Sequence, residues 1–507
     1  MTDNPAGLTV VGIGADGWAG LPGTATAALK AADVILGGDR QLALLPPDVA
    51  GERVPWPSPL LPALPGLLEE HRGRRIAVLA SGDPMFHGIG ATLSRLAAEP
   101  GPSANATLGA NAGAGADVAA GAEAGAGANA GANAGAGANA GAGADAGAGA
   151  NAGAGANAGA DAGAGVDAGA DAGAGVDVAA GADADARAGA DAGAHPGPKT
   201  RFGTMRVIPH PSSVSLAAAR LGWPLADVDV LSLVTAAVEE LHPLIHPGRK
   251  ILVLSRDAST PAQIADLLIG RGYGESTLTV LAQLGGEQET TRTGPAAELD
   301  LAGVDPLNVV AIECGRGGPA RPIIPGLPDD AYDTDGQLTK REVRAVTLAL
   351  LGPQPGELLW DVGAGSGSIA IEWMRSHRAC RAVAVESSAE RAGRVEANAA
   401  ALGVPKLKVV VGRAPGALAG LPAPDVVFIG GGVTRDGVVE AAWAALAAGG
   451  RLVANAVTVE SEAVLAAWYA KFGGELTRIA VSRASPVGGF TGWRAMMPVT
   501  IWSVVKP

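Results

Sequence analysis

The stretch that decides the fold is Leu359-Trp-Asp-Val-Gly-Ala-Gly-Ser-Gly-Ser-Ile-Ala-Ile-Glu372. An apolar run ends at Asp361, glycines alternate from Gly363 to Gly367, and a helix-forming run follows, so the pattern predicts a strand, a tight turn and a helix. Ser366 and Ser368 are suited to cap that helix. The glycines lack Cβ atoms where the backbone turns and approaches a ligand closely, which predicts a nucleotide-type site.

The spacing of these glycines separates several nucleotide ligands. The turn reads G-x-G-x-G, whereas the dinucleotide fingerprint is G-x-G-x-x-G and a phosphate loop ends in Gly-Lys-Ser/Thr. Asp361 stands two residues before the first glycine. An acid at that place suits a ligand with hydroxyl groups and a positive centre better than it suits a pyrophosphate. The sequence therefore predicts S-adenosylmethionine as the cofactor.

Length and composition bound the remaining possibilities. A chain of 507 residues has room for about three domains of ~150 residues. The net charge of −13 disfavours a nucleic-acid partner. There is no run of ~20 strongly apolar residues and no signal-peptide pattern at the start, so we expect a cytoplasmic protein with no membrane partner. Cys314 and Cys380 lack metal-ligand spacing, which predicts two structural thiols and no metal site.

Residues 101–200 form a low-complexity segment of Gly-Ala-Asn-Ala and Gly-Ala-Asp-Ala repeats. Ten acidic residues stand there against Arg187 and Lys199, so most of the net charge lies in this segment. The repeats offer no large side chains to bury, and ordering them would cost backbone entropy without an offsetting core. We expect a disordered insertion. A silk-like β stack is the alternative, which the scattered Asp residues disfavour.

Residues 1–100 and 201–314 alternate strands with helices and predict one α/β half that the insertion interrupts. Expected strands cover 8–14, 33–38, 75–80, 229–233, 250–255, 277–282 and 308–313, and expected helices cover 24–32, 87–98, 212–221 and 261–271. The first strand runs into Gly12, Gly14 and Gly17, which fit a cofactor loop, and a tight turn alone would also explain these glycines. Residues 315–335 are rich in Pro, Gly and Asp and predict an interdomain linker.

Residues 336–507 predict an open doubly wound sheet with a trailing hairpin. Expected strands cover 357–362, 381–385, 408–411, 425–430, 450–454, 476–481 and 499–504, and expected helices cover 339–350, 366–375 and 389–402. Glu386 ends the second of these strands, about 20 residues past the glycines. A carboxylate there accepts two hydrogen bonds from a ribose diol, which supports a nucleoside cofactor.

The combination of Asp361, the glycine turn and Glu386 resembles the class I S-adenosylmethionine-dependent methyltransferases. Further stretches are similar to the C-terminal half of the precorrin-6Y methyltransferase family of cobalamin biosynthesis: Asp335–Arg344, Gly412–Pro415, Phe428–Gly432 and Gly488–Trp493. Others resemble its N-terminal tetrapyrrole-methylase half: Val11–Leu21, Gly37–Leu42, Ser81–Phe86 and Ser212–Trp223. The implied fold class is α/β, with a two-lobed tetrapyrrole-methylase-like half and a C-terminal Rossmann-like doubly wound sheet.

This resemblance implies an enzyme that methylates precorrin-6Y at carbons 5 and 15 and decarboxylates the ring C acetate, giving precorrin-8X. It assigns carbon 5 to the N-terminal half, and carbon 15 with decarboxylation to the C-terminal half. Matched by position, the C-terminal cofactor contacts would be Thr339, Asp361, Gly363, Ala364, Gly365, Ser366, Gly367, Glu386 and Ala414. The N-terminal contacts would be Gly12, Gly14, Ser81, Gly82, Asp83, Ser212 and Ser213.

The implied chemistry needs little beyond positioning. Methyl transfer from a sulfonium to an electron-rich carbon requires neither a metal nor a covalent nucleophile, and the conjugated tetrapyrrole is itself an electron sink for decarboxylation. Several substrate carboxylates must be held, for which arginine is suited. Candidates near the motifs, each also explained as a surface charge, are Arg341, Arg344, Arg413, Arg435, Arg483 and Arg494. We expect a small-molecule tetrapyrrole substrate and a homo-oligomer.

Two departures from the family pattern keep another reading open. After Leu233 the family usually shows His-Gly-Arg, but this chain reads Val234-Thr-Ala-Ala-Val238, and Ala258 stands where glycine is common. The alternative is that only the C-terminal half is catalytic and the N-terminal half is a degenerate scaffold or interaction module. A third reading is a methyltransferase that acts on a different small molecule.

Overall fold

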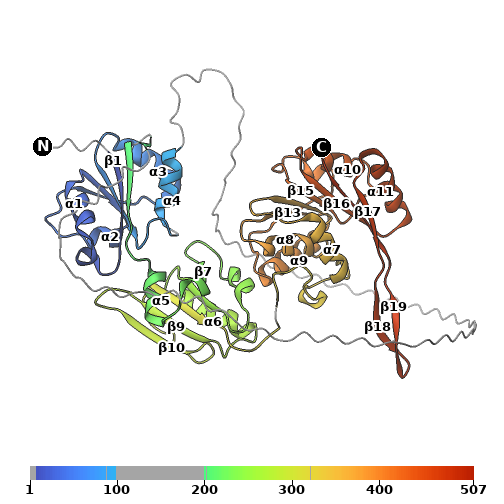
Figure 1. The fold of residues 1–507 in the computed structure, drawn as a ribbon, viewed down its shortest axis with the longest axis horizontal. Coiled ribbons are helices and arrows are strands. Elements are labelled where there is room, and N and C mark those ends of the chain that lie inside the picture. The colour runs from blue at the N-terminus through green and yellow to red at the C-terminus, as the bar shows by residue number, and fades with distance from the viewer. Residues whose placement is uncertain (1–6, 87, 99–198, 201–202, 320) are drawn as a thin grey trace, which may run out of the picture. The chain divides into compact units, whose positions relative to one another are not determined.

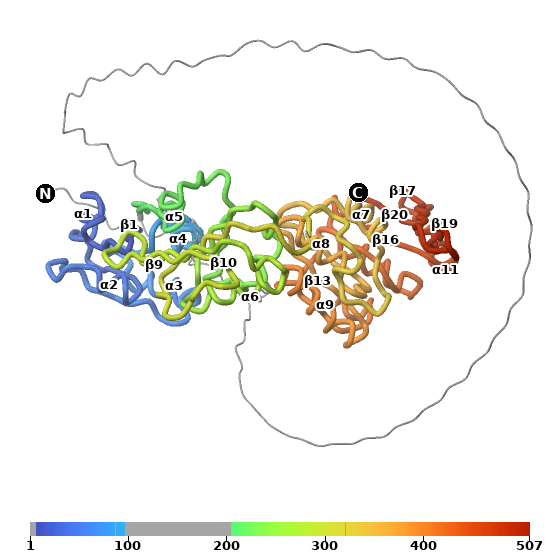
Figure 2. The backbone as a smooth tube through the Cα atoms, turned by 90° about the horizontal axis from the view of Figure 1, so that it is seen from below, coloured from blue at the N-terminus to red at the C-terminus, as the bar shows by residue number. Residues whose placement is uncertain are grey.

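The computed structural model of the protein describes residues 7–86, 88–98, 199–200, 203–319 and 321–507. These residues form three sheets with their flanking helices and one separate two-stranded hairpin (Figure 1). The segment expected to be a disordered insertion lies outside the described residues, apart from its last two. The path of the chain through the three sheets can be followed in Figure 2.

The first lobe is a six-stranded sheet in the order β3-β2-β4-β1-β6-β5. Its strands are β1 (Gly7–Ile13), β2 (Val34–Gly37), β3 (Glu52–Pro55), β4 (Ile76–Ser81), β5 (Lys199–Thr200) and β6 (Gly203–Ile208). Alternate residues of β1 enter different cores: Leu8 and Val10 pack with Leu64 and Leu68, while Val11 packs with residues of the opposite face. All pairings but that of β5 are parallel, so the glycines after β1 and the serine that ends β4 share one edge.

Four helices flank this sheet: α1 (Gly23–Ala31), α2 (Asp39–Ala43), α3 (Leu60–Glu70) and α4 (Ile89–Ala98). Strand β3 and helix α3 were not predicted. Pro55, Pro59, Pro62 and Pro65 crowd that stretch and mask its periodicity, because proline is a breaker signal in sequence.

The second lobe is a five-stranded sheet in the order β10-β9-β11-β8-β7. Its elements are α5 (Ser213–Leu221), β7 (Asp229–Ser232), β8 (Lys250–Leu254), α6 (Thr260–Gly270), β9 (Thr277–Ala282), β10 (Thr290–Pro295) and β11 (Asn308–Glu313). Only β7 and β8 pair in parallel; β11 runs antiparallel to both of its neighbours. Strand β10 was missed because its exposed residues, mostly threonines, carry no apolar alternation.

The C-terminal domain is a seven-stranded sheet in the order β14-β13-β12-β15-β16-β20-β17. The strands are β12 (Leu358–Val362), β13 (Arg381–Glu386), β14 (Lys408–Val411), β15 (Val426–Ile429), β16 (Arg451–Ala456), β17 (Glu475–Ile479) and β20 (Val499–Val505). The first five are parallel, and β20 runs antiparallel to both of its neighbours, β16 and β17. Counted from β12, this order is 3-2-1-4-5-7-6, so the chain reverses direction across the sheet between β12 and β15.

Helices cover both faces of that sheet. The helices are α7 (Arg341–Leu351), α8 (Ser368–Ser376), α9 (Ala389–Ala401), α10 (Val438–Ala445) and α11 (Val459–Phe472). Leu359 packs in one core with Ile369 and Val395, whereas Leu358 and Trp360 pack in the other. The two-residue period of β12 therefore serves both cores and turns Asp361 toward the face of α8.

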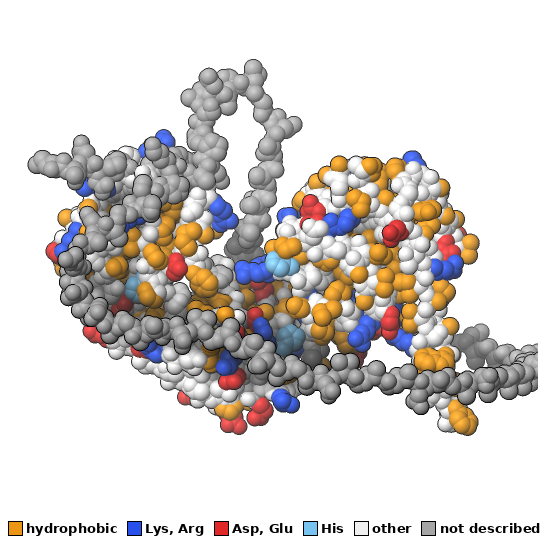
Figure 3. Space-filling model, viewed as in Figure 1, with side chains coloured by type: hydrophobic (Ala, Val, Ile, Leu, Met, Phe, Trp, Pro, Cys, Tyr) orange, Lys and Arg blue, Asp and Glu red, His pale blue; other side chains and the backbone are white. Residues whose placement is uncertain are grey.

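A hairpin of its own lies between β17 and β20. Strands β18 (Ser482–Val487) and β19 (Phe490–Ala495) pair only with each other among the described residues. The sequence predicted one trailing hairpin, whereas the structure has an antiparallel pair with this second hairpin inserted. Phe490 and Trp493 are 85% and 80% exposed, and hydrophobic side chains gather at the tip of the hairpin (Figure 3). In the part of the chain described here, no helix is long and apolar enough to cross a bilayer.

A buried ion pair joins the expected linker to the C-terminal domain. The Arg344 guanidinium is fully buried; its Nε donates to Glu372 Oε1 at 2.6 Å, and it also donates to the carbonyls of Leu327 and Thr339. Glu372 accepts further hydrogen bonds from Gly326 N, Leu327 N and Tyr332 Oη. Burial, with Glu372 adding to it, raises the pKa of Tyr332 and keeps its hydroxyl a donor. The second part of the expected linker therefore packs into the domain core.

Removing the charge of Glu372 tests how much this ion pair contributes to the stability of the domain. Glu372→Gln removes the closer of the two carboxylates that pair with the buried Arg344 cation and leaves Asp329 at 3.3 Å, and breaking a buried pair costs about 3–5 kcal/mol. We expect the free energy of unfolding of the C-terminal domain, measured from its urea transition, to fall by that amount. Glu390→Gln breaks an exposed i,i+4 pair with Arg394 and serves as the control, with a loss of at most about 1 kcal/mol. Equal losses in the two variants would contradict a structural role for the buried pair.

Candidate functional site

The glycine turn after β12 is held by close backbone approaches. Gly363, Gly365 and Gly367 have φ angles of 76°, 60° and 77°, a region that side-chain-bearing residues rarely adopt. A Cβ on Gly363 would lie 2.7 Å from Gly431 N, and one on Gly365 would lie 2.8 Å from Gln337 O. The turn thus sits where the strand order reverses, between β12 and β15, the usual ligand-binding place in open α/β sheets.

Two carboxylates flank the turn with different surroundings. Glu386, at the end of β13, accepts from Gly365 N at 2.9 Å through Oε2 and from Ser388 N at 2.9 Å through Oε1. Asp361 is buried, and only its Oδ2 accepts, from Ala370 N at 3.1 Å. Its Oδ1 has no hydrogen-bond partner within the described structure. Burial raises the pKa of Asp361 to about 7; the Ala370 hydrogen bond opposes this shift and Glu386 adds to it.

The segment before α7 lies against the same turn. Ser366 Oγ donates to Gln337 O at 2.9 Å and forms a second hydrogen bond with Thr334 Oγ1 at 2.9 Å. The expectation that Ser366 and Ser368 cap α8 is therefore wrong: Gly367 is the N-cap residue, with no side-chain cap. Ser366 instead ties down the segment that leads to Thr339. We call residues 334–340 the strap.

The other end of this edge is formed by the residues after β14. Gly412 N donates to Glu386 O at 2.8 Å, which places the following loop, with half-buried Ala414, beside the end of β13. All four segments that hold the expected C-terminal cofactor residues therefore meet at one edge of the sheet. They are the turn at 361–367, the strand end at 386, the strap and the loop at 412–415.

The candidate substrate arginines divide into two groups. Arg344 is fully buried and donates only to protein groups, so it is not free to bind a substrate carboxylate, and that expectation is corrected. Arg483 is bound to Glu342 at 2.5 Å and to Asp329 at 3.1 Å. The remaining four are exposed: Arg341, Arg413, Arg435 and Arg494.

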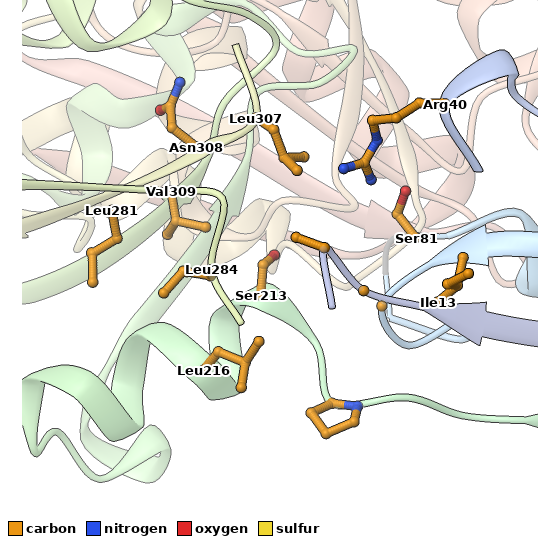
Figure 4. Close-up of a pocket in the computed structure, with 14 residues that line it drawn as sticks. Ile13, Arg40, Ser81, Ser213, Leu216, Leu281, Leu284, Leu307, Asn308 and Val309 are labelled. Carbon is orange, nitrogen blue, oxygen red and sulfur yellow. The ribbon is translucent and has the colours of Figure 1, made fainter. Parts of the chain in front are cut away.

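The N-terminal half contains a second pocket, where its two lobes meet (Figure 4). Its cavity volume is about 80 Å³, and it opens to solvent. Gly14, Ser81 and Gly82 line it from the first lobe, and Ser213 lines it at the start of α5. Of the seven expected cofactor residues, four thus line the same pocket.

The other three expected N-terminal residues support the pocket wall. A Cβ on Gly12 would lie 2.0 Å from Gly82 O, so the ends of β1 and β4 require a glycine there. Ser212 Oγ caps α5 by accepting from Ser215 N at 3.0 Å. Asp83 Oδ1 accepts from Met85 N at 2.9 Å within its own turn.

Sequence reasoning missed the rest of this pocket. Most of the missed lining is apolar and comes from the second lobe: Leu216, Leu281, Leu284, Leu307 and Val309, with Asn308 beside them. Arg40 lines the first-lobe side. These leucines read as ordinary core residues, and no local signal marks their exposure to a cavity. Arg40 stood inside a quoted motif, Gly37–Leu42, so that motif was the available signal.

A histidine–aspartate pair beneath the N-terminal glycines was also not predicted from the sequence. His210 Nε2 lies 3.0 Å from Asp16 Oδ2, and His210 Nδ1 lies 3.1 Å from Pro211 O. A Cβ on Gly14 would lie 2.7 Å from the His210 ring. This pair packs beneath the glycine loop and links the ends of β1 and β6.

The residues present fit a nucleoside cofactor with a positive centre. The three glycines leave room for a close approach, the Glu386 carboxylate stands at the neighbouring strand end, and Oδ1 of buried Asp361 has no hydrogen-bond partner within the described structure. Strand order and site together define a class I S-adenosylmethionine-dependent methyltransferase in the C-terminal domain. The chain is therefore a methyltransferase, with S-adenosylmethionine as the methyl donor.

Comparison with known proteins extends this conclusion to both halves. A family model described as "Precorrin methyltransferase domain" matches residues 330–506, and one described as "Tetrapyrrole (Corrin/Porphyrin) Methylases" matches residues 200–300. A precorrin-6Y C(5,15)-methyltransferase [decarboxylating] from Sinorhizobium sp is 40% identical over 501 residues, covering 98% of this chain and 96% of that protein. One from Mycobacterium tuberculosis (strain CDC 1551 / Oshkosh) is 39% identical over 512 residues, covering 98% and 100%.

A solved structure is similar to the C-terminal part. The C-terminal domain of precorrin-6Y C5,15-methyltransferase from Rhodobacter capsulatus is 44% identical, with 37% of this chain and 100% of that chain covered and a TM-score of 0.35. On the full-length relationships, the chain belongs to the decarboxylating precorrin-6Y C(5,15)-methyltransferase family.

The protonation of Asp361 predicts a pH-dependent stability. Because its pKa in the folded chain, about 7, exceeds the ordinary value of 3.8, the folded chain holds a proton that the unfolded chain loses between these values. This stabilisation is complete below about pH 4 and is lost as the pH rises toward about 7, by up to roughly 1.4 kcal/mol per pH unit. Asp361→Asn removes it.

Urea midpoints of the cofactor-free protein between about pH 5 and 8 measure this effect. As the pH rises to about 7, the urea midpoint of the wild type should fall relative to that of Asp361→Asn. Above about pH 7 the two midpoint curves should run parallel. Parallel curves over the whole range would contradict a neutral Asp361 in the folded chain.

Proposed function

We propose that this chain transfers two methyl groups from S-adenosylmethionine to precorrin-6Y, at carbons 5 and 15, and removes carbon dioxide from the ring C acetate to give precorrin-8X. Its membership of a family named for that reaction is the observation that carries the proposal, since the relatives match over both halves. We assign carbon 5 to the N-terminal pocket, and carbon 15 with decarboxylation to the C-terminal site. The domain limits 1–100 with 201–314, 101–200, 315–335 and 336–507 are part of this proposal.

The cofactor supplies a methyl group on a sulfonium, a leaving group that is already activated. The chain's own contribution at the C-terminal site is to orient the reactants. The glycine turn allows a close approach, Glu386 accepts ribose hydroxyl protons, and the Asp361 carboxyl lies buried beside them. Holding two reactants in line lowers the barrier by about 7–11 kcal/mol in favourable cases. No side chain needs to form a covalent bond with the substrate.

Decarboxylation follows from the same orientation. The bond from the acetate methylene to its carboxylate breaks, the electron pair enters the conjugated ring, and a proton added to the methylene carbon leaves a methyl group. Exposed arginines around the site, Arg341, Arg413, Arg435 and Arg494, are proposed to hold the other substrate carboxylates, since a planar guanidinium matches a carboxylate in two hydrogen bonds.

In the N-terminal half, the residues that depart from the family pattern stand away from the cofactor pocket. Neither residues 234–238 nor Ala258 belong to its described lining. Instead, the carbonyl of Ala236 accepts from Arg256 Nη2 at 2.8 Å. This placement favours an active N-terminal half over a degenerate scaffold. A homo-oligomer, a cytoplasmic location and the absence of a nucleic-acid partner remain predictions from the sequence.

Product analysis tests the proposed reaction. Incubation with precorrin-6Y and isotopically labelled cofactor should yield two equivalents of S-adenosylhomocysteine and one of carbon dioxide per substrate, with a product that carries two labelled methyl groups by mass. One methyl group with release of carbon dioxide would instead assign catalysis to the C-terminal half alone. One methyl group without carbon dioxide would contradict the proposal as a whole.

A further inference from the structure

The two walls of the N-terminal pocket differ in chemistry. The second lobe contributes leucine and valine side chains from β9, β11 and the loops beside them, while the first lobe contributes glycines, Ser81 and Arg40. Arg40 is the one charged side chain among the described residues that line the pocket. The apolar wall of the second lobe suits a purine. The guanidinium on the first-lobe wall suits an anion, such as the carboxylate of a ligand.

Arg40 is held in place by its neighbours. It stands in α2, directly after β2, and the next residue, Gln41, donates through Nε2 to Ser81 Oγ at 2.8 Å. This hydrogen bond joins α2 to the end of β4, the strand end that also lines the pocket. Figure 4 shows the Arg40 guanidinium turned toward Ser81 and Leu307. The contact of α2 with the end of β4 therefore places the backbone of Arg40 beside the pocket.

The Arg40 guanidinium has no hydrogen-bond or ion-pair partner within the described structure. Asp305 is the acid whose charge acts on it. The Asp305 carboxylate is already used, however, because it accepts from Gln283 Nε2 at 3.0 Å and from Leu307 N at 2.8 Å. Arg40 is an exposed cation at the pocket wall, so its planar guanidinium is free to pair with the carboxylate of an external ligand.

We propose that Arg40 binds a carboxylate of the tetrapyrrole substrate in the N-terminal pocket and so sets the register of the macrocycle for methylation at carbon 5. This inference rests on the proposed function of the N-terminal half. S-Adenosylmethionine also carries a carboxylate, but the expected cofactor residues Gly14, Gly82 and Ser213 are distinct from Arg40, and the substrate is the ligand with several carboxylates. Arg40 is thus a specificity-determining residue for the substrate.

Binding measurements on the full chain test this role. Protein saturated with S-adenosylhomocysteine is titrated with precorrin-6Y by equilibrium dialysis, and the wild type should bind two tetrapyrroles. Arg40→Ala should weaken one of these sites by roughly 10-fold or more, because a hydrogen bond to a charged group is lost, and leave the other unchanged. Arg40→Lys keeps the charge but not the planar fork, so its tetrapyrrole affinity at this site should lie between those of the wild type and Arg40→Ala. The KM of the affected methylation should rise while its kcat changes little.

The matched control is Arg95→Ala, which removes an exposed arginine of the same lobe outside the pocket lining and should leave both sites intact. Calorimetry with S-adenosylhomocysteine alone should give unchanged affinities in every variant. Two intact tetrapyrrole sites in Arg40→Ala would overturn the proposal, as would loss of S-adenosylhomocysteine affinity in place of tetrapyrrole affinity. A wild type that binds one tetrapyrrole and adds one methyl group would overturn the N-terminal function itself, and Arg40's role with it.

Discussion

The structure depends on backbone segments that approach each other more closely than a Cβ atom permits. In the C-terminal domain the turn after β12 presses against Gly431 on one side and Gln337 on the other. In the N-terminal half the end of β1 presses against Gly82 and His210. In both cases the contact brings strand ends and loops to one edge of the sheet. The same constraint, met on two different sheets, underlies both of the proposed sites.

A buried ion pair supports the close backbone approach at the C-terminal turn. The Arg344–Glu372 pair fastens residues 326–332 to α7 and α8, and the strap that follows lies on the glycine turn through Ser366. A buried ion pair contributes little net stability but is costly to break. Its main effect here is to hold the strap in one position. An arginine that contacts no ligand thus acts on the site through the segment it secures.

Much of the site followed from the sequence because its signals are local. The glycine spacing, the acid before it and Glu386 at the next strand end all lie within one β-α-β unit, and the structure brings them together. Arg344 shows where such reasoning ends: in sequence it is one more arginine near a motif, and only the fold reveals that Glu372 and the carbonyls of the strap and linker surround it. The leucines of the N-terminal pocket lie more than 200 residues after Gly14, and no periodicity marks a side chain that faces a cavity between two sheets. Ser366 was misread for a related reason, since a serine before a helix is usually a cap and a long-range partner is invisible locally.

Two cofactor sites in one chain are the central claim, and calorimetric titration of S-adenosylhomocysteine into the full-length protein tests it most directly. The wild type should bind two equivalents. Gly365→Ala, which places a Cβ against Gln337 O, should bind one, whereas Gly393→Ala, with open space around its Cβ in α9, should bind two. A single equivalent in the wild type, or two in Gly365→Ala, would contradict the account.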